Sequence, residues 1–148
     1  MKFRKLLYIV CAITFLGVGG CTGDDPEDNG AELPPRLEGI RDGTATGKGD
    51  GFGSYLGPLG KNDLEGTIGQ QISLTIDVKD GFITEVTIIG PDETPAMAGP
   101  LLINAPAVIK AKNTFDLEKA DINGTTGATL SFNGIKEAGN DALDQLRE

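Results

Sequence analysis

The chain has no histidine and no tryptophan among its 148 residues. Without histidine it cannot ligate haem through an imidazole, build most zinc or copper sites, or form a Ser–His or Cys–His nucleophile pair. Cysteine is scarce as well, since the two cysteines, Cys11 and Cys21, both stand near the amino terminus. These absences exclude most metal-dependent and thiol-dependent chemistry from the rest of the chain.

The first twenty residues have the order of a secretory leader. Basic residues at positions 2, 4 and 5 precede an apolar stretch over 6–18, which is too short to span a bilayer comfortably. The sequence LGVGGC over 16–21 resembles a lipobox, whose small residues admit a peptidase and whose cysteine accepts a diacylglyceryl group. We therefore expect 1–20 to be a lipoprotein signal peptide and Cys21 to be lipidated. The alternative is an ordinary signal peptide with a chance cysteine.

Acidic residues outnumber basic ones by 22 to 13, for a formal net charge of −9 at pH 7. The leader holds three of the basic residues and none of the acidic ones, so the remainder has ten against twenty-two, or −12. A chain this acidic repels phosphate backbones, which excludes nucleic acid as a partner. Residues 21–39 are acidic and rich in proline and glycine, and they predict a flexible tether between lipid and domain.

Residues 40–148 suit one small domain, in which alternating apolar positions predict a β-hairpin over 72–89. A three-residue loop would set Leu74 opposite Val86, whereas a two-residue loop would set Leu74 opposite Thr87. We favour the three-residue loop because it keeps one face of the hairpin apolar.

Three other patterns complete the fold prediction. Glycine at every second position over 47–53 indicates a kinked edge strand or a close approach of a large group to the backbone. A helix is expected over 100–112, with Pro106 starting a second segment. An apolar stripe over 135–146 predicts a C-terminal helix. We expect an α+β fold, with a twisted antiparallel sheet packed against helices.

The segment NGTTGATLS over 123–131 stands just before the C-terminal helix. Its ordinary interpretation is a polar turn with a helix N-cap. Small residues and hydroxyls that lead into a helix also leave N–H groups exposed at the positive end of the dipole, where phosphate is stabilised. Thr126-Gly127-Ala128-Thr129 resembles the Ser/Thr-Gly-Ala-Thr flavinylation motif of the FMN-binding domain family. That family includes the extracytoplasmic flavin subunits of sodium-pumping NADH:quinone reductase and the Rnf complex.

Three further segments resemble the family in the same order along the chain. Residues 42–44 with 49–53 resemble its opening strand and glycine-rich stretch, and 78–81 with Ile83 resemble its central hairpin. The sequence ETP over 93–95 resembles the segment that lies near the flavin. The resemblance covers 39–146 and implies an FMN-binding domain whose C-terminal helix follows the flavin-attachment turn.

The resemblance implies FMN as the cofactor, joined by a phosphoester to the hydroxyl of Thr129. In the family a flavin transferase makes this bond from FAD with a divalent metal that belongs to the transferase, so we expect no metal site in this chain. The motif and the helix start would surround the phosphate, and the ETP segment would lie against the isoalloxazine. The implied cofactor-binding residues are Thr126, Gly127, Ala128, Thr129, Leu130, Ser131, Glu93, Thr94 and Pro95.

Two features depart from the family pattern. Asn123 stands where the family usually has aspartate, six residues before the modified threonine, which bears on the efficiency of modification. Asp121 could substitute only if the loop accommodates it. Ala96 and Ala98 replace the usual glycines after the ETP segment, and since alanine resists positive φ, we expect the loop over the flavin to differ in shape.

Together these features predict an extracytoplasmic electron carrier that is lipid-anchored to a bacterial membrane and is not itself an enzyme. The absence of histidine and of clustered basic residues argues against a carboxylate-binding reductase site. Expected partners are the flavin transferase, the membrane, and redox proteins or quinone-linked donors. The alternatives are a flavin-free interaction lipoprotein that keeps the fold, and the electron-donating subunit of an extracytoplasmic reductase.

The lipobox interpretation makes Cys21 the residue on which anchoring depends. Cys21→Ser should leave an unprocessed precursor and abolish partitioning into detergent, because serine offers no thiol for the diacylglyceryl group. Processing is read from the mass of the isolated protein and anchoring from its detergent partitioning. Unchanged processing and partitioning in the variant would rule out a lipid anchor at this residue.

Overall fold

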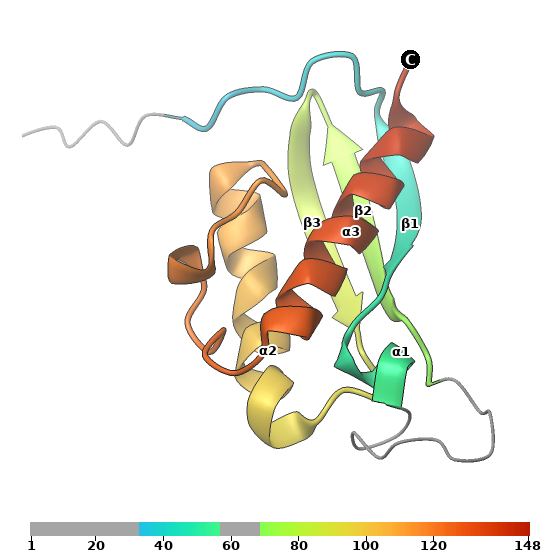
Figure 1. Cartoon of the computed structure of the whole chain (residues 1–148). Helices are drawn as coiled ribbons and strands as arrows, with labels where there is room; N and C mark the ends of the chain where they lie inside the picture. Colours follow the sequence, from blue (N-terminus) through green and yellow to red (C-terminus); the bar gives the residue numbers. More distant parts are fainter. Residues whose placement is uncertain (1–32, 57–68) are drawn as a thin grey trace, which may run out of the picture. The chain divides into compact units, whose positions relative to one another are not determined.

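The computed structural model describes residues 33–56 and 69–148, which belong to one unit. The predicted signal peptide, Cys21 and the tether as far as residue 32 lie outside the described residues. The elements, shown in Figure 1, are in chain order β1 (Gly43–Gly49), α1 (Phe52–Leu56), β2 (Ile72–Lys79), β3 (Phe82–Ile89), α2 (Pro95–Lys112), the 3-10 turn η2 (Lys119–Asp121) and α3 (Thr129–Leu146). No helix in the described ranges is both long enough and apolar enough to cross a membrane.

The strands β1, β2 and β3 form an antiparallel sheet in that order. Figure 1 shows α3 running across β1 and β2, while α2 lies beside β3. The inward positions of β2 are apolar and buried, namely Ile72, Leu74, Ile76 and Val78. Its outward positions are polar and pair across strands, as in the 2.8 Å hydrogen bond between the hydroxyls of Thr75 and Thr46. Burial on one face explains the alternating sequence of β2. The antiparallel sheet packed against helices confirms the predicted α+β fold.

The β2–β3 turn differs from the prediction. Lys79 pairs with Phe82, so the loop has two residues, Asp80 and Gly81, whose φ angles of 53° and 77° fit a type I′ turn. A register shift between Asp77 and Val78 then places one extra residue in β3.

The bulge restores the apolar pairing that a two-residue loop would otherwise destroy. Beyond it, Leu74 faces Ile88 and Ile76 faces Val86, while the consecutive residues Thr84 and Glu85 are both exposed. The predicted three-residue loop is therefore wrong. That loop was chosen to keep one face of the hairpin apolar, and the hairpin does keep one apolar face. A bulge inside the strand preserves that face in place of a longer loop.

The alternating glycines of β1 admit the backbone of α3. A Cβ atom at Gly47 would lie 2.0 Å from the carbonyl oxygen of Ala138, and one at Gly49 would lie 2.0 Å from that of Gly134. Real Cβ atoms do not approach backbone so closely, so both positions require glycine. The glycine pattern thus marks an edge strand and a close approach together, and the approaching group is the C-terminal helix.

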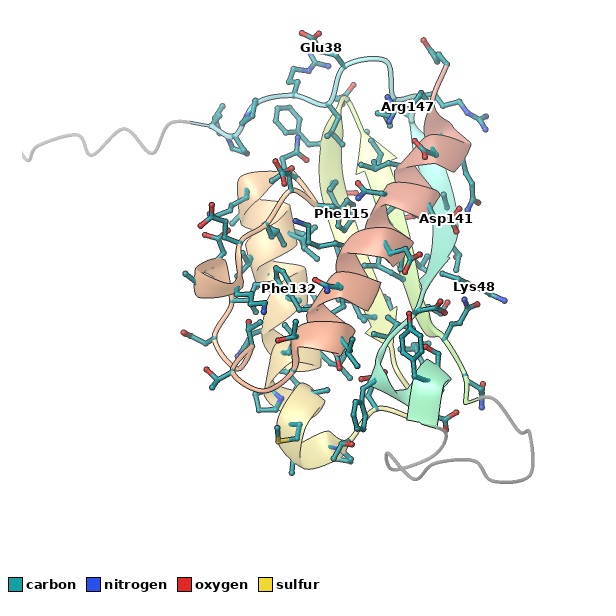
Figure 2. The ribbon with its side chains drawn as sticks, in the orientation of Figure 1. Glu38, Lys48, Phe115, Phe132, Asp141 and Arg147 are labelled. Atoms are coloured by element: carbon teal, nitrogen blue, oxygen red, sulfur yellow. The ribbon has the colours of Figure 1, made fainter. Side chains whose placement is uncertain are left out.

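Side chains of α3 also satisfy the free edge of β1. The backbone N–H groups of Lys48 and Asp50 donate to the carboxylates of Asp141 and Glu137, each at 2.9 Å. One turn further along α3, the side-chain amide of Gln145 donates to a β1 carbonyl at 2.9 Å. Figure 2 shows Asp141 and Lys48 on the same side of the molecule. These contacts pair edge groups that would otherwise be open to another strand.

Helix α2 also departs from the prediction. It begins at Pro95 and runs without a break through Pro106, so the predicted second segment is wrong. Its buried residues Ala98, Leu101, Ala105 and Ile109 face the core, and this tertiary packing overrides the local cost of two internal prolines. The C-terminal helix, in contrast, is confirmed as α3, with Ile135, Ala138, Ala142, Leu143 and Leu146 buried.

Asn113 ends α2 in a left-handed conformation and is buried. Its Oδ1 accepts the backbone N–H of Ile83 at 2.7 Å, and its Nδ2 donates to the carbonyls of Gly81 and Pro35 at 3.0 and 2.8 Å. The backbone N–H of Leu37 donates to Gly81 at 2.9 Å. Part of the stretch assigned to the tether therefore contacts the hairpin, and the exact domain boundary stays a prediction.

The contact between β1 and α3 predicts a strong effect of one added methyl group. Gly49→Ala should lower the free energy of unfolding by about 3 kcal/mol, because the new Cβ overlaps helix backbone that cannot move without separating α3 from the sheet. Unfolding in urea, followed by circular dichroism, measures the difference.

Gly99→Ala in α2 is the matched control, since nothing lies within 4 Å of an added Cβ there. Its gain in helix propensity is partly offset by the proline that follows, so its stability should stay within about 1 kcal/mol of wild type. Equal losses in the two variants would contradict the close packing of α3 on β1.

Candidate functional site

Three segments far apart in the sequence meet at one end of α3. They are the glycine-rich stretch that continues into α1, the Glu93–Pro95 segment that leads into α2, and the turn that leads into α3. Thr94 is the N-cap of α2, and Pro95 is the first residue of that helix. The segment expected to form a loop over the flavin is therefore the first turn of α2, in which Ala96 and Ala98 are helical.

An apolar cavity of about 200 Å³ lies between these segments. It is lined by Phe52, Glu93, Thr94, Met97, Ala98, Gly127, Ala128, Thr129, Leu130 and Ser131. Seven of the nine residues implied by the resemblance are in this set. Thr126 lines a neighbouring cavity instead, and Pro95 lines neither.

Glu93 ties the three segments together. Its side chain is only 4 % exposed; Oε1 accepts the backbone N–H of Gly53 at 2.9 Å, and Oε2 accepts the hydroxyl of Ser131, which is also buried. A Cβ at Gly51 would lie 2.2 Å from Oε1, so this glycine leaves the space that the carboxylate occupies. Because both carboxylate oxygens are hydrogen-bonded, Glu93 holds the wall of the cavity in place.

The turn before α3 brings its backbone close to α2. Gly127 has a φ of 80°, and a Cβ there would lie 2.4 Å from the terminal methyl of Met97. The backbone N–H of Ala128 donates to the carbonyl of Thr125 at 3.0 Å, and the Thr125 hydroxyl donates to that of Ile122 at 2.6 Å. These bonds close the turn and place Thr129 at the first position of the helix.

The amino terminus of α3 is open to an anion. Ala128 is its N-cap residue and provides no side-chain cap, and the first turn contains no acidic residue. The backbone N–H groups of Thr129, Leu130 and Ser131 come before the first i→i−4 hydrogen bond, which Phe132 donates to Ala128 at 2.9 Å. Uncapped N–H groups at the positive end of a helix stabilise phosphate.

A second, polar cavity of about 420 Å³ lies on the other side of Thr129. It is lined by Lys119, Ala120, Ile122, Asn123, Gly124, Thr125, Thr126, Gly127 and Thr129. The ammonium of Lys119 donates to Thr129 Oγ1 at 2.9 Å. Thr129 is exposed and lines both cavities, so its hydroxyl stands between an apolar space and a polar one.

Asp121 lines neither of the two cavities beside Thr129. Its carboxylate accepts hydrogen bonds from the ammonium of Lys112 and, at 2.8 Å, from the backbone N–H of Glu118. The hydrogen bond from Lys112, helped by that from Glu118 and by the charge of Lys112, lowers the pKa of Asp121 below its ordinary value. Asn123 itself is exposed, and its carbonyl accepts the side-chain amide of Asn104 at 2.9 Å.

The family model of the FMN-binding domain matches residues 68–144, slightly more than half of the chain. The chain belongs to the FMN-binding domain family. The match includes three of the four segments on which the resemblance was based, those within 78–129, and it confirms the family; FMN is the cofactor. No curated protein and no solved structure matches the chain.

The geometry of this FMN-binding domain fits both chemical halves of FMN. The apolar cavity, with Phe52, Met97 and Leu130 in its lining, suits part of an isoalloxazine ring. The open N–H groups of α3 and the ammonium of Lys119 suit a phosphate. Among residues 33–56 and 69–148, no group of three side chains is placed to hold a metal ion.

The prediction from sequence missed four residues of the FMN-binding domain's site. Phe52, Met97 and Ala98 line the apolar cavity, and Lys119 contacts Thr129. The glycine stretch had marked the region of Phe52, and the two alanines after the ETP segment had marked that of Met97. Lys119 carried no signal, because it precedes Thr129 by ten residues in a segment without recognisable pattern.

The ion pair of Asp121 makes a pH-dependent prediction for the loop before Thr129. Because the pKa of Asp121 is lowered in the folded protein, its contribution to stability is complete above the ordinary aspartate pKa and disappears as the pH falls through the lowered one. Asp121→Asn should therefore lower the Tm slightly at pH 7, and the difference from wild type should shrink toward zero well below about pH 4. Thermal unfolding across this pH range measures it. A difference that stays constant with pH would contradict a stabilising charge on Asp121.

Proposed function

We propose that this protein is an extracytoplasmic electron carrier, anchored to a bacterial membrane through Cys21, with FMN joined by a phosphoester to Thr129. The observation that carries the proposal is the position of Thr129. Its exposed hydroxyl stands at the uncapped start of α3, between an apolar cavity and a polar one. An amphipathic cofactor tied to this oxygen can place its ring on one side and its phosphate on the other.

The attachment step follows from the chemistry of the threonine hydroxyl. A flavin transferase would supply FAD and a divalent metal. A bond forms between Thr129 Oγ1 and the flavin-side phosphorus, the pyrophosphate bond of FAD breaks, and AMP leaves. The hydroxyl proton passes to a base of the transferase or to water. The exposure of Thr129 supports this proposal, since a second protein must reach its oxygen.

The cavity favours a carrier over an enzyme. Its volume of about 200 Å³ is below the range of roughly 300–1,000 Å³ that is common for ligand pockets, which leaves little space for a substrate beside the ring. Among the described residues that line it, Glu93 is the one titratable group, and both of its oxygens accept hydrogen bonds from the protein. Bound FMN supplies two-electron and one-electron redox chemistry, and the surrounding residues supply orientation without an evident acid or base.

The lipid anchor would hold this carrier close to membrane donors and acceptors. The leader over 1–20 and Cys21 support the anchor, and the acidic segment after Cys21 supports a tether of variable reach. Redox partner proteins or quinone-linked donors at the membrane surface are the partners that such an arrangement serves.

Thr129→Ala is the direct test. After coexpression with a flavin transferase, the mass of the wild type should exceed that of the polypeptide by one FMN less one water, and Thr129→Ala should lack this increment. The modified wild type should be reduced and reoxidised reversibly in voltammetry without turning over fumarate or a similar small acceptor. Intact mass and voltammetry are measured on the same preparations.

Thr126→Ala is the matched control, because it removes a neighbouring hydroxyl of the same motif and should keep the increment. Loss of the increment in Thr126→Ala, with retention in Thr129→Ala, would show that FMN is attached to Thr126 and that the assignment to Thr129 is wrong. A wild type that never acquires flavin would favour the flavin-free interaction lipoprotein. Steady reduction of fumarate by the isolated protein would move the assignment from carrier to reductase.

A further inference from the structure

Lys119 contacts the residue at the start of α3 with its charged group. It is exposed, yet its ammonium is directed at one particular hydroxyl, to which it donates a hydrogen bond of 2.9 Å. That hydroxyl is Thr129 Oγ1, the atom that would become bonded to phosphorus. Of the described residues that line the polar cavity, Lys119 is the one with a charge.

The backbone of Lys119 is held by its neighbours. Lys119 begins the η2 turn, which is closed by reciprocal hydrogen bonds between Glu118 and Asp121 of 2.8 and 3.0 Å. The salt bridge from Lys112 to Asp121 ties this turn to the end of α2. The ammonium is therefore presented to Thr129 from a turn with a defined geometry.

The charge of Lys119 is also available for an anion. In the described part of the chain, no carboxylate oxygen lies within 4.0 Å of its ammonium, whereas Lys110, Lys112 and Lys136 each have such a partner. A cation beside an oxygen that becomes negatively charged stabilises that charge. The same cation then forms a charge-assisted hydrogen bond with a phosphate at that place.

We propose that Lys119 is the group that receives the flavin phosphate at Thr129. It stabilises negative charge on Oγ1 and on the phosphate while the phosphoester forms, and it pairs with the phosphodiester afterwards. The ammonium keeps its proton throughout, and the bonds made and broken are those of the transfer from FAD described above. This inference rests on the proposed attachment at Thr129.

The experiment compares Lys119→Gln and Lys119→Arg with Lys110→Gln, a control that removes the same charge from the exposed face of α2. The full chain is prepared without flavin and incubated with flavin transferase, FAD and a divalent metal, and attachment is timed by intact mass. Lys119→Gln should slow attachment about threefold to tenfold, the effect of one solvent-exposed charge-assisted hydrogen bond. Lys119→Arg should restore most of the rate, and Lys110→Gln should leave it unchanged.

Two further readouts separate phosphate contact from a structural role or a docking role. At saturating FAD, Lys119→Gln should lower kcat and leave the KM for the protein substrate unchanged. In the modified protein, the ³¹P resonance of the phosphodiester should shift in Lys119→Gln and stay in place in Lys110→Gln. Thermal unfolding of the flavin-free variants should match wild type, because the Lys119 side chain is exposed.

The outcomes distinguish this inference from the proposal on which it rests. If the wild type is not modified, attachment at Thr129 is itself wrong. If the wild type is modified and Lys119→Gln has the same kcat and the same ³¹P shift, attachment stands and the role of Lys119 is overturned. A raised KM with unchanged kcat would also overturn it, because Lys119 would then serve to dock the transferase.

Discussion

The contact between the backbone of α3 and the glycines of β1 is the constraint on which the rest of this structure depends. Because Gly47 and Gly49 have no side chains, the carbonyls of Ala138 and Gly134 approach the strand directly. Because α3 lies so close to β1, two of its acidic side chains accept hydrogen bonds from the free edge of this strand. The start of α3 is then fixed beside the glycine-rich stretch, where Glu93 joins the two by hydrogen bonds. The position of Thr129 is thus a consequence of helix–strand packing.

The site has an apolar cavity on one side of Thr129 and a polar cavity on the other. Apolar side chains from α1, α2 and α3 line one cavity, and the polar turn before α3 lines the other. Thr129 lines both cavities, so a cofactor attached there, as proposed, would have an apolar side and a charged side. The apolar cavity is small, so part of an isoalloxazine ring bound there would lie outside it. A partly exposed flavin suits exchange of electrons with another protein better than conversion of an enclosed substrate.

The parts of the fold that could be predicted are those with a strong periodic signal. The stripe over 135–146 became α3, and the alternation over 72–78 became β2. The register of the hairpin could not be predicted, because a bulge in β3 and a longer turn both preserve one apolar face. Helix α2 was expected to break at Pro106, because proline interrupts helices locally. The burial that keeps it continuous arises only when it packs on the sheet, so the sequence alone does not reveal it.

The sequence by itself determined the family and its cofactor, because the motif over 126–129 and the segments that accompany it are local patterns in a fixed order. It also determined that no thiol or imidazole in the domain could supply redox chemistry. Only the tertiary structure decided what surrounds Thr129. The ammonium of Lys119, the ring of Phe52 and the carboxylate of Glu93 come from separate segments, and the folding of the chain alone brings them together. Contacts of this kind leave no pattern in sequence spacing, because they depend on how deeply a helix packs against a strand.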